Sequence, residues 1–229
     1  MDILLIGGLW LDGSTAWDAV VPALRELGHR PRPLTLPGQG DGNASATLED
    51  QVAAVVAAVD ASAGKPLLVV HSAACSLGWM VADARPERIA DLVMIGGFPH
   101  DDGHPYADLF EVRDGAMAFP GWEPFAGADS ADLGEELRER LAADAVPVPE
   151  KVARGTVRLN DPRRYRVPVT VLCPEFTAEQ ARTWVAAGDV PALALAERVE
   201  FADIDSGHWP MFSRPAELAK LLDEVASRA

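Results

Sequence analysis

Cysteine is scarce in this chain of 229 residues, which contains only Cys75 and Cys173. Two cysteines cannot supply the disulfide framework of a small secreted domain, and their number fits a reducing compartment such as the cytoplasm. The chain also lacks a Cys/His pattern of the zinc-binding kind and a Gly-Lys-Ser/Thr phosphate-binding loop. We therefore expect neither a metal ion nor a cofactor.

Long hydrophobic runs are absent as well. The first apolar segment, residues 3–6, follows Met1-Asp2 directly and is too short for a membrane span or for the apolar part of a signal peptide. These features predict a cytoplasmic protein that does not enter a membrane.

Basic residues are few. Lys and Arg number 20 against 35 Asp and Glu, which gives a formal net charge of −15. A surface this acidic disfavours binding to nucleic acid or to an anionic membrane. We expect a small molecule as the binding partner, and a monomer or a homodimer.

Short apolar segments alternate with amphipathic ones along most of the chain. Strands are predicted at residues 3–6, 32–36, 67–70, 89–95, 167–172 and 199–204. Helical spacing is found between them, and a final helix is predicted at residues 215–226. This alternation predicts an α/β fold with a mostly parallel, six-stranded sheet covered by helices on both faces.

The alternation breaks at residues 98–165. This segment contains seven prolines and only one predicted helix, at residues 132–143. Residues 101–150 carry 13 acidic and three basic side chains, a pattern that fits a solvated surface or a field that repels anionic molecules. We expect a single domain over residues 1–229, with residues 98–165 inserted as a lid.

Ser72 stands between a buried strand and a helix of small residues. A strand-to-helix turn that lifts a serine above a sheet needs small neighbours two positions away on either side. Ala74 meets this need, whereas Val70 leaves less room. The pattern is typical of a nucleophilic serine, and it also fits a serine that only caps the helix.

Three further stretches complete a resemblance to the α/β-hydrolase fold superfamily over nearly the whole chain. Gly7-Gly8-Leu9-Trp10 resembles the loop after the family's third strand, although Gly7 stands where the family often has His. Residues 37–42 resemble its Pro-Gly-x-Gly loop, and residues 205–211 resemble the loop that carries its histidine. The chain is most similar to small cofactor-free hydrolases, esterases and hydroxynitrile-lyase-like members.

The resemblance implies a nucleophile, an acid and a histidine in that order along the chain. Ser72 takes the position of the nucleophile and His208 that of the base. The backbone N–H groups of Leu9 and Ala73 take the positions of the oxyanion donors.

The acid is less clearly marked. The position at which the family most often carries Asp is Thr177 here, and Glu175 is the only carboxylate in that turn. Glu175 is therefore the first candidate, and Asp101 or Asp102, after the preceding strand, is the alternative. The remaining possibility is that no acid is present.

Aromatic and histidine side chains near these loops are candidates for lining a pocket. They are Trp10, His71, Trp122, Phe176 and Trp209. Each of the aromatics could equally be part of the core, and His71 could have a structural role beside Ser72.

These assignments imply a serine hydrolase that cleaves a carboxylic ester or thioester of a small, apolar, non-anionic substrate through an acyl-enzyme. A lyase or a cofactor-free perhydrolase on the same scaffold is an alternative interpretation. So is a non-catalytic protein that binds a small molecule.

Overall fold

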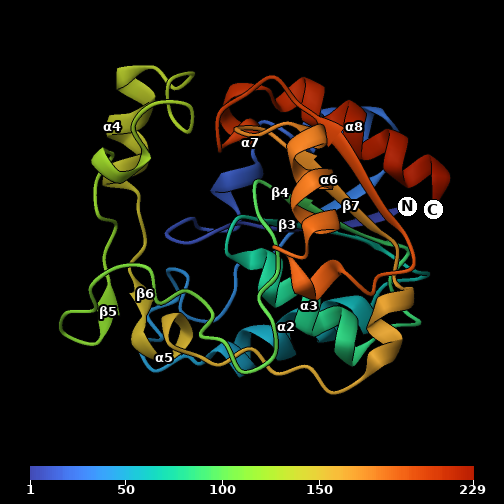
Figure 1. Ribbon diagram of the computed structural model, residues 1–229. Coiled ribbons are helices and arrows are strands. Elements are labelled where there is room, and N and C mark those ends of the chain that lie inside the picture. Colours follow the sequence, from blue (N-terminus) through green and yellow to red (C-terminus); the bar gives the residue numbers. More distant parts are fainter.

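The computed structural model describes all 229 residues, and its centre is one parallel sheet in the order β2-β1-β3-β4-β7-β8 (Figure 1). The strands of this sheet are β1 (Asp2–Ile6), β2 (Arg30–Pro33), β3 (Leu67–His71), β4 (Asp91–Ile95), β7 (Val169–Cys173) and β8 (Val199–Asp203). The α-helices are α1 (Val21–Glu26), α2 (Leu48–Asp60), α3 (Ala74–Ala84), α4 (Glu135–Ala143), α5 (Glu150–Ala153), α6 (Ala178–Ala187), α7 (Pro210–Ser213) and α8 (Pro215–Arg228). The predicted α/β fold with six parallel strands is confirmed.

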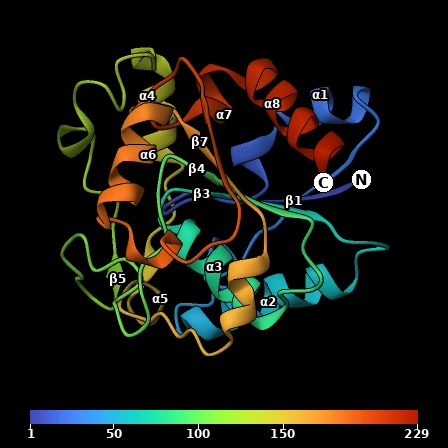
Figure 2. The same cartoon turned by 45° about the vertical axis from the view of Figure 1, so that its right-hand side comes forward.

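Helices cover both faces of the sheet, as Figure 2 shows for α1 and α8 on one side and α2 and α3 on the other. Successive side chains of a strand point to opposite faces. Leu4 and Ile6 of β1 accordingly belong to the apolar cluster under α2 and α3, whereas Ile3 and Leu5 belong to the cluster under α1 and α8. None of the helices is both long enough and apolar enough to cross a membrane.

The strand register brings the carboxyl ends of four strands to one edge. Ile6 pairs with Val70, His71 with Ile95, and Ile95 with Leu172. The chain passes from β1 outward to β2 and later returns to β3 on the other side of β1, so the strand order reverses here. Ligands of open α/β sheets bind at the carboxyl ends of the strands at such a point.

Residues 98–165 contain more regular structure than the sequence predicted. A two-stranded antiparallel sheet joins β5 (Ala116–Met117) to β6 (Val148–Pro149), and Figure 1 shows it with α4 and α5 to one side of the main sheet. The predicted helix at 132–143 begins later, at Glu135, after Gly134 at its N-cap. The far end of this segment is tied to α3, because the buried Asp83 carboxylate accepts hydrogen bonds from the backbone of Asn160 and Asp161.

The predicted bounds of β2 are also wrong. β2 covers Arg30–Pro33 rather than residues 32–36, because its single neighbour β1 pairs with it from Asp2 to Leu5. Its two prolines are tolerated at the edge of a sheet. Between β1 and β2 the chain forms a short 3-10 turn at Thr15–Trp17, followed by α1, in whose first turn Pro22 lies.

Asp91, at the start of β4, allows a prediction about stability. The residue is only 4% exposed, and this burial raises the pKa of its carboxyl from 3.8 to about 6, while Thr170 and Arg198 oppose the shift. Below pH 3.8 the group is protonated in both states. As the pH rises to 6 the unfolded chain loses this proton before the folded protein does, so the free energy of unfolding falls.

We therefore expect Asp91→Asn to raise the free energy of unfolding above pH 6, by up to about 3 kcal/mol at roughly 1.4 kcal/mol per pKa unit. Urea unfolding at pH 4 and pH 8 measures this effect. Asp189→Asn, which removes one exposed carboxylate, is the control. An Asp91→Asn protein that is no more stable than wild type at pH 8 contradicts the expectation.

Candidate active site

Ser72 occupies a sharp turn between β3 and α3 and has a φ of +57°. Positive φ is uncommon for residues other than glycine and marks backbone strain that the surroundings must hold in place. Two hydrogen bonds hold this turn: the Ser72 N–H donates to the Ile95 carbonyl at 2.8 Å, and the Cys75 N–H donates to the Ser72 carbonyl at 2.9 Å. The turn presents the serine hydroxyl at the carboxyl edge of the sheet.

The space that this turn needs comes from glycines elsewhere in the chain. A Cβ on Gly78 of α3 would lie 2.9 Å from Cγ1 of Val70, and a Cβ on Gly97 would lie 3.0 Å from the Ser72 carbonyl oxygen. The crowding that the sequence predicted at Val70 is therefore relieved by Gly78, one helical turn beyond Ala74.

His208 links the serine to a carboxylate. Its Nε2 lies 2.9 Å from Ser72 Oγ, and its Nδ1 lies 2.8 Å from Glu175 Oε1. The His208 and Glu175 side chains are 14% and 17% exposed. An ionised carboxylate only accepts hydrogen bonds, so Nδ1 carries the proton and donates it, and Nε2 is free to accept from the serine hydroxyl.

The other candidate acids have different partners. The Asp102 carboxylate accepts a hydrogen bond from the Leu159 N–H at 2.8 Å, and Asp101 does not contact the imidazole of His208. Thr177, at the position where the family most often carries Asp, caps α6 by accepting a hydrogen bond from the Gln180 N–H.

Three contacts hold the backbone around His208, and the sequence predicted none of them. The His208 N–H donates to the Asp129 carbonyl at 2.8 Å, and the Gly207 N–H donates to the Asp132 carboxylate at 2.8 Å. The His208 carbonyl accepts from His71 Nε2 at 2.8 Å. Gly207 was the one visible signal, because a Cβ at this position would collide with the Asp129 carbonyl.

His71 has a structural position rather than one in a pocket. It is fully buried, and its pKa lies well below the ordinary value because burial and the nearby His208 both disfavour its charged form. A Cβ on Gly8 would lie 2.7 Å from its Nδ1, so the loop after β1 packs directly on the imidazole. The neutral ring therefore supports both this loop and the His208 backbone.

Two backbone amides beside Ser72 have no partner within the protein. The loop after β1 approaches the serine closely, since a Cβ on Gly8 would lie 3.1 Å from Ser72 Cβ. Neither the Leu9 N–H on this loop nor the Ala73 N–H donates a hydrogen bond. Unpaired N–H groups beside a serine are suited to binding an oxyanion.

An aromatic cavity lies on one side of this loop. All of its lining residues are hydrophobic: Leu9, Trp10, Leu11, Phe119, Trp122, Leu141, Ala145 and Trp209. Trp10 and Phe119 pack edge to face at 5.5 Å, and so do Trp122 and Trp209 at 5.2 Å. Trp209 follows His208 in the chain, so this cavity adjoins the imidazole.

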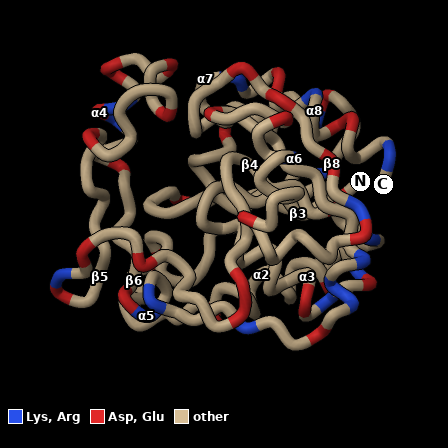
Figure 3. The backbone as a smooth tube through the Cα atoms, in the orientation of Figure 1, with Lys and Arg blue, Asp and Glu red and all other residues tan.

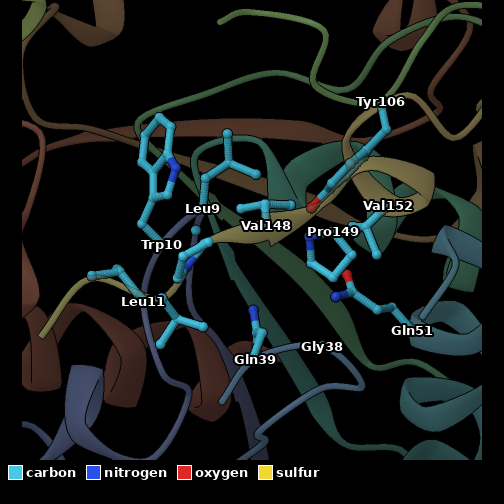
Figure 4. Close-up of a pocket in the computed structure, with 13 residues that line it drawn as sticks. Leu9, Trp10, Leu11, Gly38, Gln39, Gln51, Tyr106, Val148, Pro149 and Val152 are labelled. Carbon is cyan, nitrogen blue, oxygen red and sulfur yellow. The ribbon is translucent and has the colours of Figure 1, made fainter. Parts of the chain in front are cut away.

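The pocket residues predicted from the sequence therefore divide into two groups. Trp10, Trp122 and Trp209 line the aromatic cavity, whereas Phe176 stacks on Phe98 at a ring distance of 5.5 Å. A second cavity, which we call the slot, lies between residues 8–11 and residues 146–152 (Figure 4).

Comparisons with known proteins agree with this architecture. Residues 3–221 match the family described as "Alpha/beta hydrolase family". Methylesterase 7 of Arabidopsis thaliana is 24% identical over 243 residues, which cover 94% of this chain and 93% of that relative.

Two solved structures share the fold. An extracellular alpha/beta-hydrolase from a Paenibacillus species superposes with a TM-score of 0.80 at 21% identity, covering 98% of both chains. A pyrethroid hydrolase from Sphingobium faniae superposes with a TM-score of 0.76 at 20% identity, covering 99% of this chain and 97% of its own.

Proposed function

The chain belongs to the alpha/beta hydrolase family, and on that basis we propose that it is a serine esterase that cleaves small, uncharged, apolar esters through an acyl-enzyme. The hydrogen-bonded series Ser72–His208–Glu175 carries the proposal. The three side chains lie in the arrangement of a nucleophile, a base and an orienting acid.

Acylation uses the protonation state described above. Ser72 Oγ attacks the ester carbonyl while its proton passes to His208 Nε2, and the carbonyl π electrons move onto the oxygen. The free N–H groups of Leu9 and Ala73 bind that oxyanion. His208 then returns the proton to the alkoxy oxygen as the bond to carbon breaks, so the alcohol leaves and the acyl group stays on Ser72.

Deacylation repeats these steps with water. His208 removes a proton from the water molecule as its oxygen attacks the acyl carbon, and it then returns the proton to Ser72 Oγ. The carboxylic acid is released. Glu175 stays ionised and stabilises the imidazolium that forms in each half-reaction.

The distribution of charged side chains supports an uncharged substrate. Figure 3 shows acidic positions spread along α4 and around β5 and β6, and no charged side chain lines the aromatic cavity. Residues 101–150 carry 13 acidic and three basic side chains, and the negative electrostatic potential of this segment disfavours the entry of an anion. Methylesterase 7 bears the name of an enzyme that acts on esters, which agrees with this substrate class.

We further propose that residues 98–165 act as the lid, because they supply Phe119, Trp122 and Leu141 to the cavity wall. We also propose that the enzyme works in the cytoplasm, although one structural neighbour is extracellular. Both cysteines are free and buried, which fits a reducing compartment.

The proposal is tested by labelling with a fluorophosphonate and by hydrolysis of two matched esters. We expect the label on Ser72, and we expect kcat/KM for p-nitrophenyl valerate to exceed that for p-nitrophenyl hemisuccinate at least about tenfold at low salt. The ratio should fall at high salt, because salt screens the acidic field.

Other outcomes separate the alternatives. If the protein cleaves a cyanohydrin but hydrolyses no ester, its activity is that of a lyase and not of an esterase. If it forms a peracid and shows neither of these activities, it is a perhydrolase. Absence of labelling and of all turnover would leave a binding protein. A hemisuccinate rate equal to the valerate rate would overturn the uncharged substrate class.

A further inference from the structure

The slot holds a tyrosine hydroxyl group that has no partner within the protein. Tyr106 is 4% exposed, and Figure 4 shows its hydroxyl oxygen ending beside Val148 and Pro149, inside the slot. This hydroxyl makes no hydrogen bond within the protein, whereas that of Tyr165 accepts one from Arg164 at 2.7 Å. Buried tyrosine hydroxyls usually find a partner, so this one is suited to a ligand.

The surroundings of Tyr106 define the chemistry of that ligand. Burial raises the pKa of its hydroxyl, so the group stays protonated and can donate a hydrogen bond. Gln51 supplies a second polar atom: its Nε2 donates to the Pro37 carbonyl at 2.9 Å, which leaves the amide oxygen unpaired. No charged side chain lines the slot, so the group that binds there is neutral and contains an oxygen.

The slot adjoins the loop after β1, which approaches the serine. Gly8, which approaches both Ser72 and His71, belongs to its wall, and so does Leu9. Trp209, next to His208, lines the aromatic cavity instead. His208 must protonate the leaving oxygen, so the alcohol part of the ester extends toward the aromatic cavity and the acyl part extends toward the slot.

We infer that the slot binds the acyl arm of the substrate and that Tyr106 donates a hydrogen bond to a neutral oxygen on that arm. This inference rests on the proposed esterase function and makes Tyr106 a determinant of specificity. The free space in the slot is small, so it suits a short arm rather than a whole substrate. Keto, hydroxy or alkoxy esters with short acyl chains are the class that fits.

Two p-nitrophenyl esters of similar size test the assignment. The levulinate carries a ketone on its acyl chain, and the valerate does not. We expect the wild-type enzyme to prefer the levulinate, and Tyr106→Phe to lower the levulinate-to-valerate ratio of kcat/KM about 5- to 10-fold, as expected for one hydrogen bond between neutral groups. Tyr165→Phe, which alters the chain's other tyrosine, should leave the ratio unchanged.

A binding measurement separates this inference from the proposed function. In the Ser72→Ala background, methyl levulinate titrated by NMR should bind about fivefold more weakly when Tyr106→Phe is added. If esters are hydrolysed but Tyr106→Phe changes both rates equally, Tyr106 is structural and the inference is wrong. If no ester is hydrolysed and Ser72 is not labelled, the esterase proposal itself fails.

Discussion

Ser72→Ala should lower kcat for p-nitrophenyl valerate by about 10⁴-fold or more. The variant keeps the free amides of Leu9 and Ala73 but loses the atom that attacks the carbonyl. Oxyanion binding and substrate binding alone leave about 10³–10⁴-fold catalysis over water in comparable enzymes. Stopped assays with purified protein measure the loss, and the absence of fluorophosphonate labelling should accompany it.

The fold of the Ser72→Ala protein should be unchanged. Alanine at this position has the same Cβ and therefore carries the same strain at a φ of +57°, so the melting temperature should stay close to that of wild type. Ser62→Ala is the matched control, because it removes a buried hydroxyl that donates a hydrogen bond to the Ala58 carbonyl at the end of α2. A Ser72→Ala protein with more than about 1% of wild-type kcat would exclude the acyl-enzyme mechanism.

The position of Ser72 could be predicted from the apolar segment before it, and that of His208 from the resemblance of residues 205–211 to the histidine loop of the family. Each lies in a loop at the carboxyl edge of a parallel sheet, and the register of that sheet brings such loops together. Thr177 could not be interpreted in the same way. Its Thr-x-x-Gln pattern forms a capping box at the start of α6, a local signal that competes with a role in the site.

The three contacts that hold the backbone around His208 were not predictable from the sequence. They come from Asp129, Asp132 and His71, and two of these contacts use backbone carbonyls that carry no residue signature. The segment from 98 to 165 has little hydrophobic periodicity, so nothing predicted that residues 129–132 would reach the histidine loop. For the same reason nothing predicted that Tyr106 would enter the slot.

Glu175 fits the site although it precedes the usual acid position by two residues. Gly96, with a φ of +60°, leaves the space that the longer side chain needs, since a Cβ there would lie 3.3 Å from Glu175 Oε2 and 3.1 Å from His208 Nδ1. The extra methylene of glutamate and the missing side chain of glycine together let the carboxylate reach Nδ1 at 2.8 Å.

Glu175→Gln should therefore lower kcat by about 10³–10⁴-fold with little change in KM, the effect expected when the orienting acid of a triad becomes an amide. A neutral amide cannot stabilise the imidazolium. If its NH₂ faces Nδ1, the proton must move to Nε2, and the imidazole can no longer accept the proton of Ser72. Initial rates over a range of ester concentrations separate kcat from KM.

Two variants control for charge and for the rival acid. Glu179→Gln removes an exposed carboxylate from the first turn of α6 and should keep kcat within about twofold of wild type, as surface substitutions usually do. Asp102→Asn weakens the contact with the Leu159 N–H but leaves the His208 imidazole unaltered, so its kcat should also stay near wild type. If Asp102→Asn or Asp101→Asn loses as much kcat as Glu175→Gln, or if Glu175→Gln keeps more than about a tenth of it, the imidazole is oriented by another group during turnover.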